Sequence, residues 1–448
     1  MLFQLLSPII VLGLAGCVVQ ETSVSDTRVA GVIYHTQDDA IAPGIDDWET
    51  AVVEPQISYD RSLTLGEAIH RSLRYSPALH AAALETEAKH GEVDQAGVRP
   101  NPEASIELEN FGGTSDFGGF ASAEETLAIS QLVELGGKRY NRLAVAQLDR
   151  DVSAWDYEAQ RLKVTKDTAE AFIDVLAIQE AIARATEAHR IASELERDVS
   201  GRVEAGTASP IEIQRTRPIV ANTLVRLHAE QARLEPSKRR LASMWGASTL
   251  DFGRVAGRFR MGTDLPRVER ILVDLANNPE IARWSDEIAR RDAFVALQLA
   301  NSVPDLTLGA GVRRLNDTDD TAIVASASIP LPLFNRNEGN IHAAESRLAK
   351  AEFERAATAA SLRSVILKTY GDLAAAAAEV RALAGEVVPP ARAAYRAVQT
   401  SYQAGVSDLL AVLDARRVLF DAELNLIEAQ ARFEKARVRI EGLIGRKI

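Results

Sequence analysis

The sequence of 448 residues contains a single cysteine, Cys17, and aromatic side chains make up only 5% of it. One cysteine excludes a disulfide framework and a thiolate metal cluster, because both need several thiols. After the N-terminal apolar stretch there is no run of about 18 apolar residues, so no transmembrane helix is predicted. The HExxH, P-loop, GxGxxG and GxSxG patterns are also missing. These absences predict a protein that is not an enzyme and holds no cofactor.

Charge and histidine content argue against nucleic-acid and metal binding. The formal net charge is -12, whereas nucleic-acid binding needs a basic stripe. An acidic surface or lumen would admit cations, although ordinary solubility charge explains the value equally well. His70, His80 and His90 recur every ten residues, which on a helix leaves successive side chains about 80° apart. We therefore expect solvated histidines, no metal site and no nucleic-acid partner.

The N-terminus predicts export and a lipid anchor. Residues 1–16 are apolar and uncharged, long enough for a signal peptide and too short to span a bilayer. The small residues before Cys17 resemble the lipobox of bacterial lipoproteins, in which the cysteine is lipidated and becomes the new N-terminus. The missing positive charge before Cys17 departs from that pattern, and a buried, inert cysteine is the alternative. In the lipoproteins that this stretch resembles, an Asp after the cysteine signals retention in the inner membrane, so the resemblance implies that Val18 favours the outer membrane. Residues 17–62 are expected to form a lipidated extended arm.

Long helices are expected beyond residue 62. Residues 141–198 contain no Pro or Gly and carry apolar residues at 3,4 spacing, which predicts a coiled-coil helix of about 90 Å. A second long helix is expected over residues 340–383, with Pro389 and Pro390 as a kink or break.

Two stretches alternate like strands instead. "EASIELEN" (103–110) places Ala104, Ile106 and Leu108 on one face, and "DLTLGAGVRR" (305–314) alternates likewise. An apolar face opposite a polar face fits a barrel with lipid outside and water inside, and hairpins on a soluble core are the alternative. The predicted strands form two hairpins, at about 103–111 and 126–133, and about 305–314 and 321–329.

The arrangement occurs twice. Sliding the chain by 199 residues aligns two identical Gln-Ala-Arg stretches, and it pairs Arg217 with Arg416. Four strands cannot close a barrel, and open edges in lipid cost several kcal/mol per unpaired backbone group, so copies must join. Three copies would supply twelve strands. The predicted division is a first repeat (63–246), a linker (247–268) and a second repeat (269–448).

Three stretches carry a resemblance to a known family: "SYQAGVSDLLAVLDARRVLFDAELNLIEAQARFEKAR" (401–437), "LAISQLVELGGKR" (127–139) and "SIPLPLFNRNEGNI" (328–341). The chain resembles the TolC-like outer-membrane efflux factors, and the last two stretches resemble their heavy-metal, CzcC-like branch. The resemblance implies a mainly α fold with a transmembrane portion: a homotrimeric 12-stranded β-barrel in the outer membrane and a long α-helical barrel in the periplasm.

The resemblance also implies function and partners. The chain would be the passive exit duct of a tripartite efflux system, with a periplasmic adaptor and an inner-membrane resistance-nodulation-division pump. Divalent heavy-metal cations are the expected cargo, and organic drugs are the alternative. From other classes, a periplasmic adaptor lipoprotein has one hairpin rather than a duplicated unit, and a soluble coiled-coil scaffold predicts no alternating strands.

Two turns between long helices form the expected periplasmic tip. Glycine tolerates the left-handed geometry that ends a helix, and Ser209 and either Ser407 or Asp408 can cap the helix that follows. A plain helical hairpin accounts for these features. The resemblance adds contacts with the adaptor, expected at Ala205, Gly206, Thr207, Ala404, Gly405 and Val406.

A gate is expected just beyond the second turn. Leu410, Asp414 and Arg417 are spaced i, i+4, i+7 and share a helical face. The resemblance implies that they constrict the closed aperture, whereas the first repeat has Ile211 and Arg215 there. The alternative is a solvated face with an intrahelical Asp414–Arg417 pair.

Overall fold

The computed structural model describes residues 62–259 and 264–448. The predicted signal peptide (1–16), Cys17 and all of the expected arm except Ser62 lie outside the described residues.

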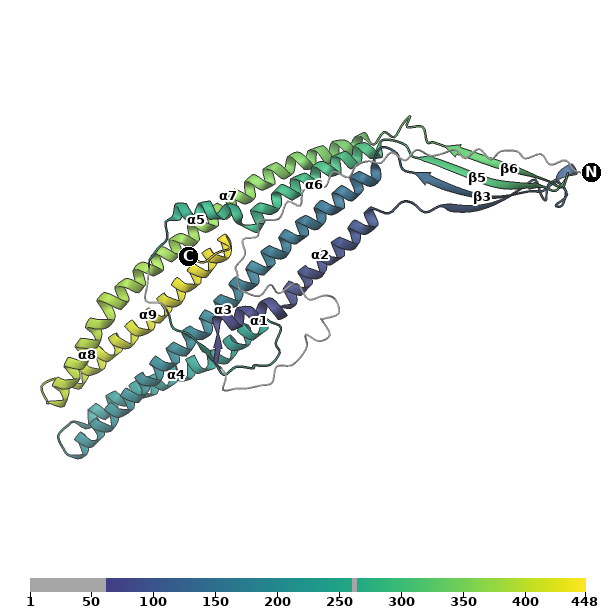
Figure 1. The fold of residues 1–448 in the computed structure, drawn as a ribbon. Coiled ribbons are helices and arrows are strands. Elements are labelled where there is room, and N and C mark those ends of the chain that lie inside the picture. Colours follow the sequence, from purple (N-terminus) through teal and green to yellow (C-terminus); the bar gives the residue numbers. More distant parts are fainter. Residues whose placement is uncertain (1–61, 260–263) are drawn as a thin grey trace, which may run out of the picture. The chain divides into compact units, whose positions relative to one another are not determined.

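Four long strands form one antiparallel sheet in the order β2-β3-β5-β6 (Figure 1). β2 and β3 are the first hairpin, β5 and β6 are the second, and β3 pairs with β5 across the two repeats. One edge of β2 and one edge of β6 have no partner strand within the described sheet. The strands span Glu103–Glu109 (β2), Glu124–Val133 (β3), Leu306–Leu315 (β5) and Asp320–Ser328 (β6).

The register gives the sheet one apolar face and one polar face. Ile106, Leu127, Val312 and Ile323 are aligned in one row across the four strands. All four are exposed, Ile106 to 83% and Ile323 to 88%. Directly opposed residues of antiparallel strands share a face, so this row forms one continuous apolar band. The predicted alternation is therefore present in the folded sheet.

Arg313 organises the opposite face. Its guanidinium donates to the Thr126 hydroxyl at 2.9 Å, to Glu124 at 2.8 Å and to Glu109 at 3.2 Å. These partners come from β2 and β3, so the polar face is held together across three strands by hydrogen bonds to one charged group.

Helices make up most of the remaining chain. None of those within residues 62–259 and 264–448 is both long enough and apolar enough to cross a membrane. The α-helices are α1 (Leu65–Tyr75), α2 (Pro77–Ala96), α3 (Lys138–Glu204), α4 (Pro210–Ser243), α5 (Val268–Asp274), α6 (Pro279–Asn301), α7 (Glu338–Ala382), α8 (Val388–Gln403) and α9 (Leu409–Ile444), with 3-10 turns at Ser115–Phe117 and Leu275–Asn277.

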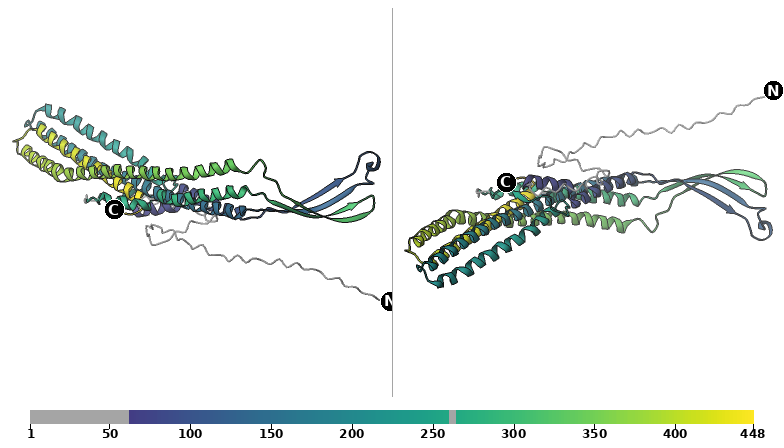
Figure 2. Two further views of the ribbon diagram at one scale, coloured as in Figure 1. Left: turned by 90° about the horizontal axis from the view of Figure 1, so that it is seen from above. Right: turned by 90° about the horizontal axis from the view of Figure 1, so that it is seen from below.

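The order of elements repeats. In each half a helix leads into a strand hairpin, a long helix follows, and a tight turn leads into a returning helix: α2-β2-β3-α3-α4 and α6-β5-β6-α7-α8-α9. α3 packs against α2, α4, α6 and α9, so it joins the two halves (Figures 1 and 2). One core cluster contains Phe172 and Leu241 of the first half, and another contains Ile366 and Ile440 of the second.

The second long helix breaks just before the two prolines. α7 ends at Ala382, a π-helical turn covers Leu383–Val387, and α8 begins at Val388. Pro389 and Pro390 thus lie in the first turn of α8, where proline is tolerated because the first amides of a helix have no intrahelical acceptor.

A small parallel pair joins the start of the described chain to the region between the repeats. β1 (Ser62–Thr64) pairs with β4 (Arg254–Ala256). β4 lies within the stretch predicted to be a linker, 247–268, of which residues 260–263 are outside the described part. Ser62, the last residue of the expected arm, begins β1.

Candidate functional site

The two tip turns have the same backbone geometry. In the first, the Thr207 amide donates to the Arg202 carbonyl at 2.8 Å and the Gly206 amide to the Val203 carbonyl at 3.0 Å. In the second, Val406 donates to Ser401 and Gly405 to Tyr402, both at 2.9 Å. Both are Schellman motifs, with Gly206 at φ 72° and Gly405 at φ 75°. A side chain at either glycine would be strained.

Different residue types begin the returning helices. The Ser209 hydroxyl accepts from the Ile211 amide at 3.4 Å, and Pro210 occupies the first turn of α4. The Asp408 carboxylate accepts from the Ala411 amide at 2.9 Å. Of the two caps considered for the second turn, Asp408 is therefore the one that forms.

The two turns are tied to one core. A cluster of buried residues combines Val199 of α3 with Tyr402 of α8 and Leu409 and Val412 of α9. Arg202 lies over the Tyr402 ring, and the Tyr402 hydroxyl is 3.5 Å from the Glu212 carboxylate in α4. Figure 2 shows the two helical hairpins reversing at the same end. The six predicted contact residues are all exposed at these turns: Ala205, Gly206, Thr207, Ala404, Gly405 and Val406.

The three predicted gate residues lie on the outside of α9. Leu410 is exposed, and Arg417 Nη2 donates to Asp414 Oδ1 at 3.0 Å. The side chains of this pair remain more than half exposed. Within one copy, Asp414 and Arg417 therefore form the intrahelical ion pair on a solvated helix face that is the alternative to a gate. The corresponding residues of the first half, Ile211 and Arg215, are also exposed.

One residue of this region was not singled out from the sequence as a site residue. Arg416 is only 7% exposed, and in the described part of the chain neither of its terminal guanidinium nitrogens has a hydrogen-bond partner. Burial lowers the pKa of the guanidinium, while Tyr395 and Glu187 act in the opposite direction. The Glu187 carboxylate is bonded instead to Arg190, at 2.6 and 2.8 Å.

The sequence does contain a signal for this burial. Leu409, Val412 and Arg416 follow the 3,4 spacing of a core stripe, so Arg416 occupies an apolar position. Its repeat counterpart, Arg217, is 66% exposed and lies 3.9 Å from Glu196. The two halves have therefore diverged in the environment of this arginine.

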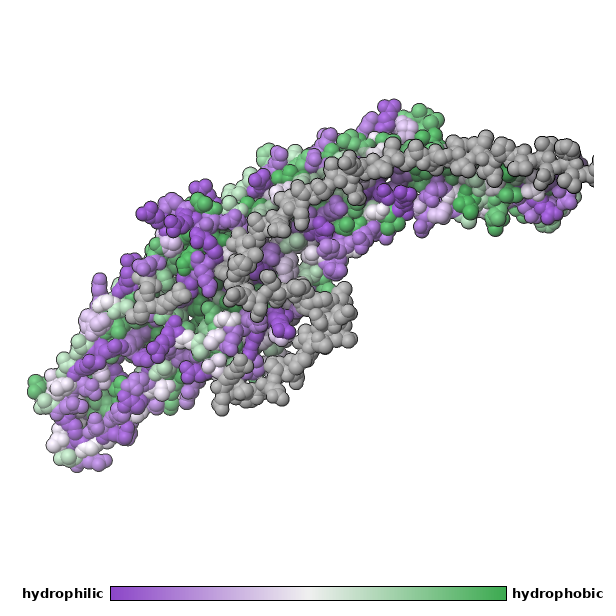
Figure 3. All heavy atoms as spheres, viewed as in Figure 1, coloured by the Kyte–Doolittle hydropathy of each residue, from purple (hydrophilic) through white to green (hydrophobic). Residues whose placement is uncertain are grey.

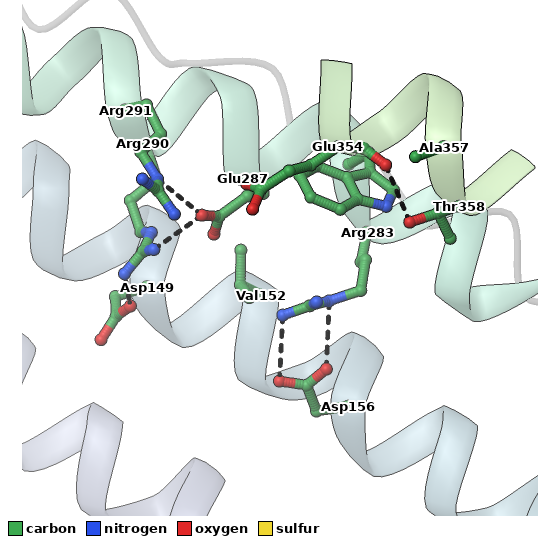
Figure 4. Close-up of a pocket in the computed structure, with 11 residues that line it drawn as sticks. Asp149, Val152, Asp156, Arg283, Glu287, Arg290, Arg291, Glu354, Ala357 and Thr358 are labelled. Carbon is green, nitrogen blue, oxygen red and sulfur yellow. Dashed lines mark hydrogen bonds and ion pairs between the residues drawn. The ribbon is translucent and has the colours of Figure 1, made fainter. Parts of the chain in front are cut away.

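A polar cavity of about 620 Å³ lies between α3, α6 and α7 (Figure 4). Arg290 Nη1 donates to Asp149 at 2.5 Å and its Nη2 to Glu287 at 2.8 Å, while Arg283 Nε lies 3.1 Å from Asp156. Burial raises the pKa of the Asp156 carboxyl. Each of these carboxylates faces an arginine, so the cluster joins α3 to α6 by ion pairs.

No metal-binding set is found in residues 62–259 and 264–448: no group of three or more His, Cys, Asp or Glu is placed to hold an ion.

Comparisons with known proteins agree with the two-repeat architecture. The sequence pattern of the outer membrane efflux protein family matches residues 68–247 and 273–446. The cobalt-zinc-cadmium resistance protein CzcC of Cupriavidus metallidurans is 30% identical over 384 residues, which is 86% of this chain and 90% of CzcC. The nickel and cobalt resistance protein CnrC of the same organism is 29% identical over 63% of this chain and 67% of its own.

A solved structure shows the same fold. The outer membrane protein VceC of Vibrio cholerae superposes with a TM-score of 0.70 at 19% identity, over 86% of this chain and 96% of VceC. This similarity confirms the TolC-like, mainly α fold of the prediction, whereas the homotrimeric 12-stranded β-barrel stays a prediction. The family pattern covers both halves of the chain and thereby confirms the resemblance, so this protein belongs to the outer membrane efflux protein family.

Proposed function

We propose that the protein is the passive exit duct of a tripartite efflux system for divalent heavy-metal cations, working as a homotrimer with a periplasmic adaptor and a resistance-nodulation-division pump. The observation that carries the cargo class is the 30% identity with a cobalt-zinc-cadmium resistance protein over 86% of the chain. The family match in both halves gives no support to the adaptor-lipoprotein alternative.

The sheet supports the trimer. Its apolar band suits lipid, but its two open edges would leave unpaired backbone groups in the bilayer. Because four strands alternate in direction, β6 of one copy is antiparallel to β2 of the next, and copies can extend the ladder. Twelve strands from three copies would enclose a water-filled bore.

The charge of the polar face supports a cation cargo. Glu103, Glu107 and Glu109 of β2 lie on this face, and Glu109 is aligned through β3 and β5 with Asp320 of β6. Arg313 offsets only part of this negative charge. A negative wall concentrates cations without requiring a tight site.

The tip supports adaptor docking, with six exposed residues on two turns that share one buried core. Lipidation of Cys17 would add a second attachment to the outer membrane.

A deletion strain tests the cargo. We expect it to become sensitive to cobalt, zinc, cadmium or nickel salts and to recover when the gene is restored. Sensitivity confined to dyes and antibiotics would instead support the organic-drug alternative.

A further inference from the structure

The two hairpins connect to their long helices in different ways. The first connection, residues 134–137, is short and is fixed against the end of α6. The Leu135 amide donates to the Asp305 carboxylate at 3.0 Å. A Cβ added at Gly136 would lie 2.8 Å from the Val303 Cβ, so the backbone is in close contact there.

The second connection, residues 329–337, is longer and apolar. Its four large apolar side chains, Ile329, Leu331, Leu333 and Phe334, are all exposed, Leu331 to 74% and Phe334 to 99%. The connection stands out beside the start of α7 in Figure 1, and hydrophobic atoms appear there in Figure 3. We call residues 329–334 the apolar loop.

The apolar loop is anchored at both ends. It follows the last paired residue of β6, Ser328. At its other end the Asn337 amide group donates to the Gln298 backbone carbonyl at 2.7 Å and to its side-chain oxygen at 3.1 Å. Within it, the Leu333 amide donates to the Leu331 carbonyl at 2.8 Å. The exposed apolar side chains therefore belong to a segment with defined attachments.

The apolar loop continues the apolar face of the sheet. Ile323 lies in the apolar band, and Ile329 and Leu331 follow at even intervals along the same alternation, up to the turn closed by the Leu333–Leu331 hydrogen bond. Pro330 and Pro332 favour extended backbone at the residues before them, which extends this pattern beyond the last strand pair.

We propose that the apolar loop inserts into the inner boundary of the bilayer and contacts lipid acyl chains, as a second lipid-binding surface next to the strands. This inference rests on the proposed duct, because it takes the apolar band to face lipid. Two observations favour lipid over another copy of the chain: the continuity with that band, and the position of exposed Arg336 two residues after the end of the uncharged loop. Arginine there would reach the phosphate headgroups while the loop contacts the chains.

Lipid quenching of a tryptophan tests the proposal. We would reconstitute full-length Phe334→Trp in phosphatidylcholine vesicles whose acyl chains carry bromine at shallow or deep positions. The emission of the wild type, which has four tryptophans, is subtracted. We expect the added emission to be quenched, more strongly by shallow than by deep bromines.

Two further variants make the result interpretable. Phe353→Trp is the matched control. Phe353 is an exposed aromatic residue like Phe334, but it lies in α7, about 22 Å along the helix from its first residue, Glu338. Its emission should not be quenched. Ile323→Trp reports on the apolar band itself and should be quenched.

The outcomes separate the two proposals. Quenching at position 323 without quenching at 334 would leave the duct intact and overturn the lipid contact of the loop. In that case blue-shifted emission at 334 would indicate cover by another copy, and red-shifted emission would indicate water. Absence of quenching at both positions would contradict the lipid-facing sheet as well. Leu331→Trp replaces Phe334→Trp if the latter fails to assemble, with the same expectations.

Discussion

The guanidinium carbon of Arg202 lies 4.7 Å from the centroid of the Tyr402 ring, and this contact joins the end of α3 to the end of α8. Tyr402 is buried, and its hydroxyl also approaches Glu212 of α4. The two tip turns therefore share one aromatic side chain.

Tyr402→Ala should loosen both turns together. Truncation of a buried aromatic residue costs about 3 kcal/mol or more, so hydrogen exchange of the amides around both glycines should accelerate. Tyr140→Ala is the control, since Tyr140 is an exposed residue of α3, and it should have little effect. Faster exchange at only one turn would contradict a shared core.

Removal of the Asp414–Arg417 pair should open the duct without destabilising the fold. An exposed pair of this kind contributes about 0.3–0.5 kcal/mol, so a double alanine variant should melt like the wild type. If three copies of the pair close the aperture, single-channel conductance in planar bilayers should rise. Alanine at the exposed Lys368–Asp372 pair of α7 is the matched control. A conductance unchanged from the wild type would exclude the gate.

Arg416→Met should stabilise the protein. The substitution replaces a buried guanidinium, whose two terminal nitrogens have no hydrogen-bond partner in the described part of the chain, by an apolar side chain of similar length. Replacement of buried ionic groups by apolar residues often gains about 1–4 kcal/mol. Arg217→Met, at the exposed equivalent position, should change stability by no more than about 0.5 kcal/mol. Denaturant unfolding of both variants measures the difference, and a destabilised Arg416→Met would show that the guanidinium has a partner in the assembled protein.

The ion pairs of Asp149 predict a pH dependence. Burial alone would raise the pKa of this carboxyl, but Lys89 and Arg290 hold it below its ordinary value. A folded-state pKa below the unfolded one stabilises the protein above the unfolded value of about 3.9, and this contribution is lost as the pH falls through the folded-state pKa. Asp149→Asn should therefore lower the melting temperature at pH 7, and the difference from wild type should shrink below about pH 4.

Asp151→Asn serves as the control for this pH series. The Asp151 carboxylate is more exposed and pairs only with its sequence neighbour Arg150 among the ion pairs of the described chain. Equal melting profiles for the two variants would contradict a special role of Asp149.

Cys17→Ala should give a precursor-length protein without lipid. The lipobox interpretation requires the thiol of Cys17 for acylation before the signal peptide is removed. Metabolic labelling with a fatty acid, followed by gel electrophoresis, measures both properties. Wild type and variant with the same mobility and no label would contradict lipidation.

Local patterns explain why much of the fold was predictable. The alternation around Ile106 and Val312 requires only neighbouring residues, and the sheet retains it. The prediction of a break at Pro389 and Pro390 was close, but proline is compatible with the start of a helix, so the break itself falls on the preceding π turn.

Features that depend on tertiary packing were harder to predict from the sequence. Charge alone suggests that Arg416 is solvated, and only its place in a core stripe signals burial. The exposure of Phe334 depends on how residues 329–337 leave the sheet, which no local pattern determines. The pairing of β1 with β4 joins segments about 190 residues apart, and three-residue strands carry too little periodicity to be recognised.

The two unpaired margins of the sheet have a genetic consequence. In the proposed ring every copy takes part in two seams, one through β2 and one through β6. A single copy with a defective edge strand therefore prevents closure of a ring whose other copies are normal. Alleles that alter these margins should behave as dominant, whereas alleles that merely abolish synthesis should be recessive.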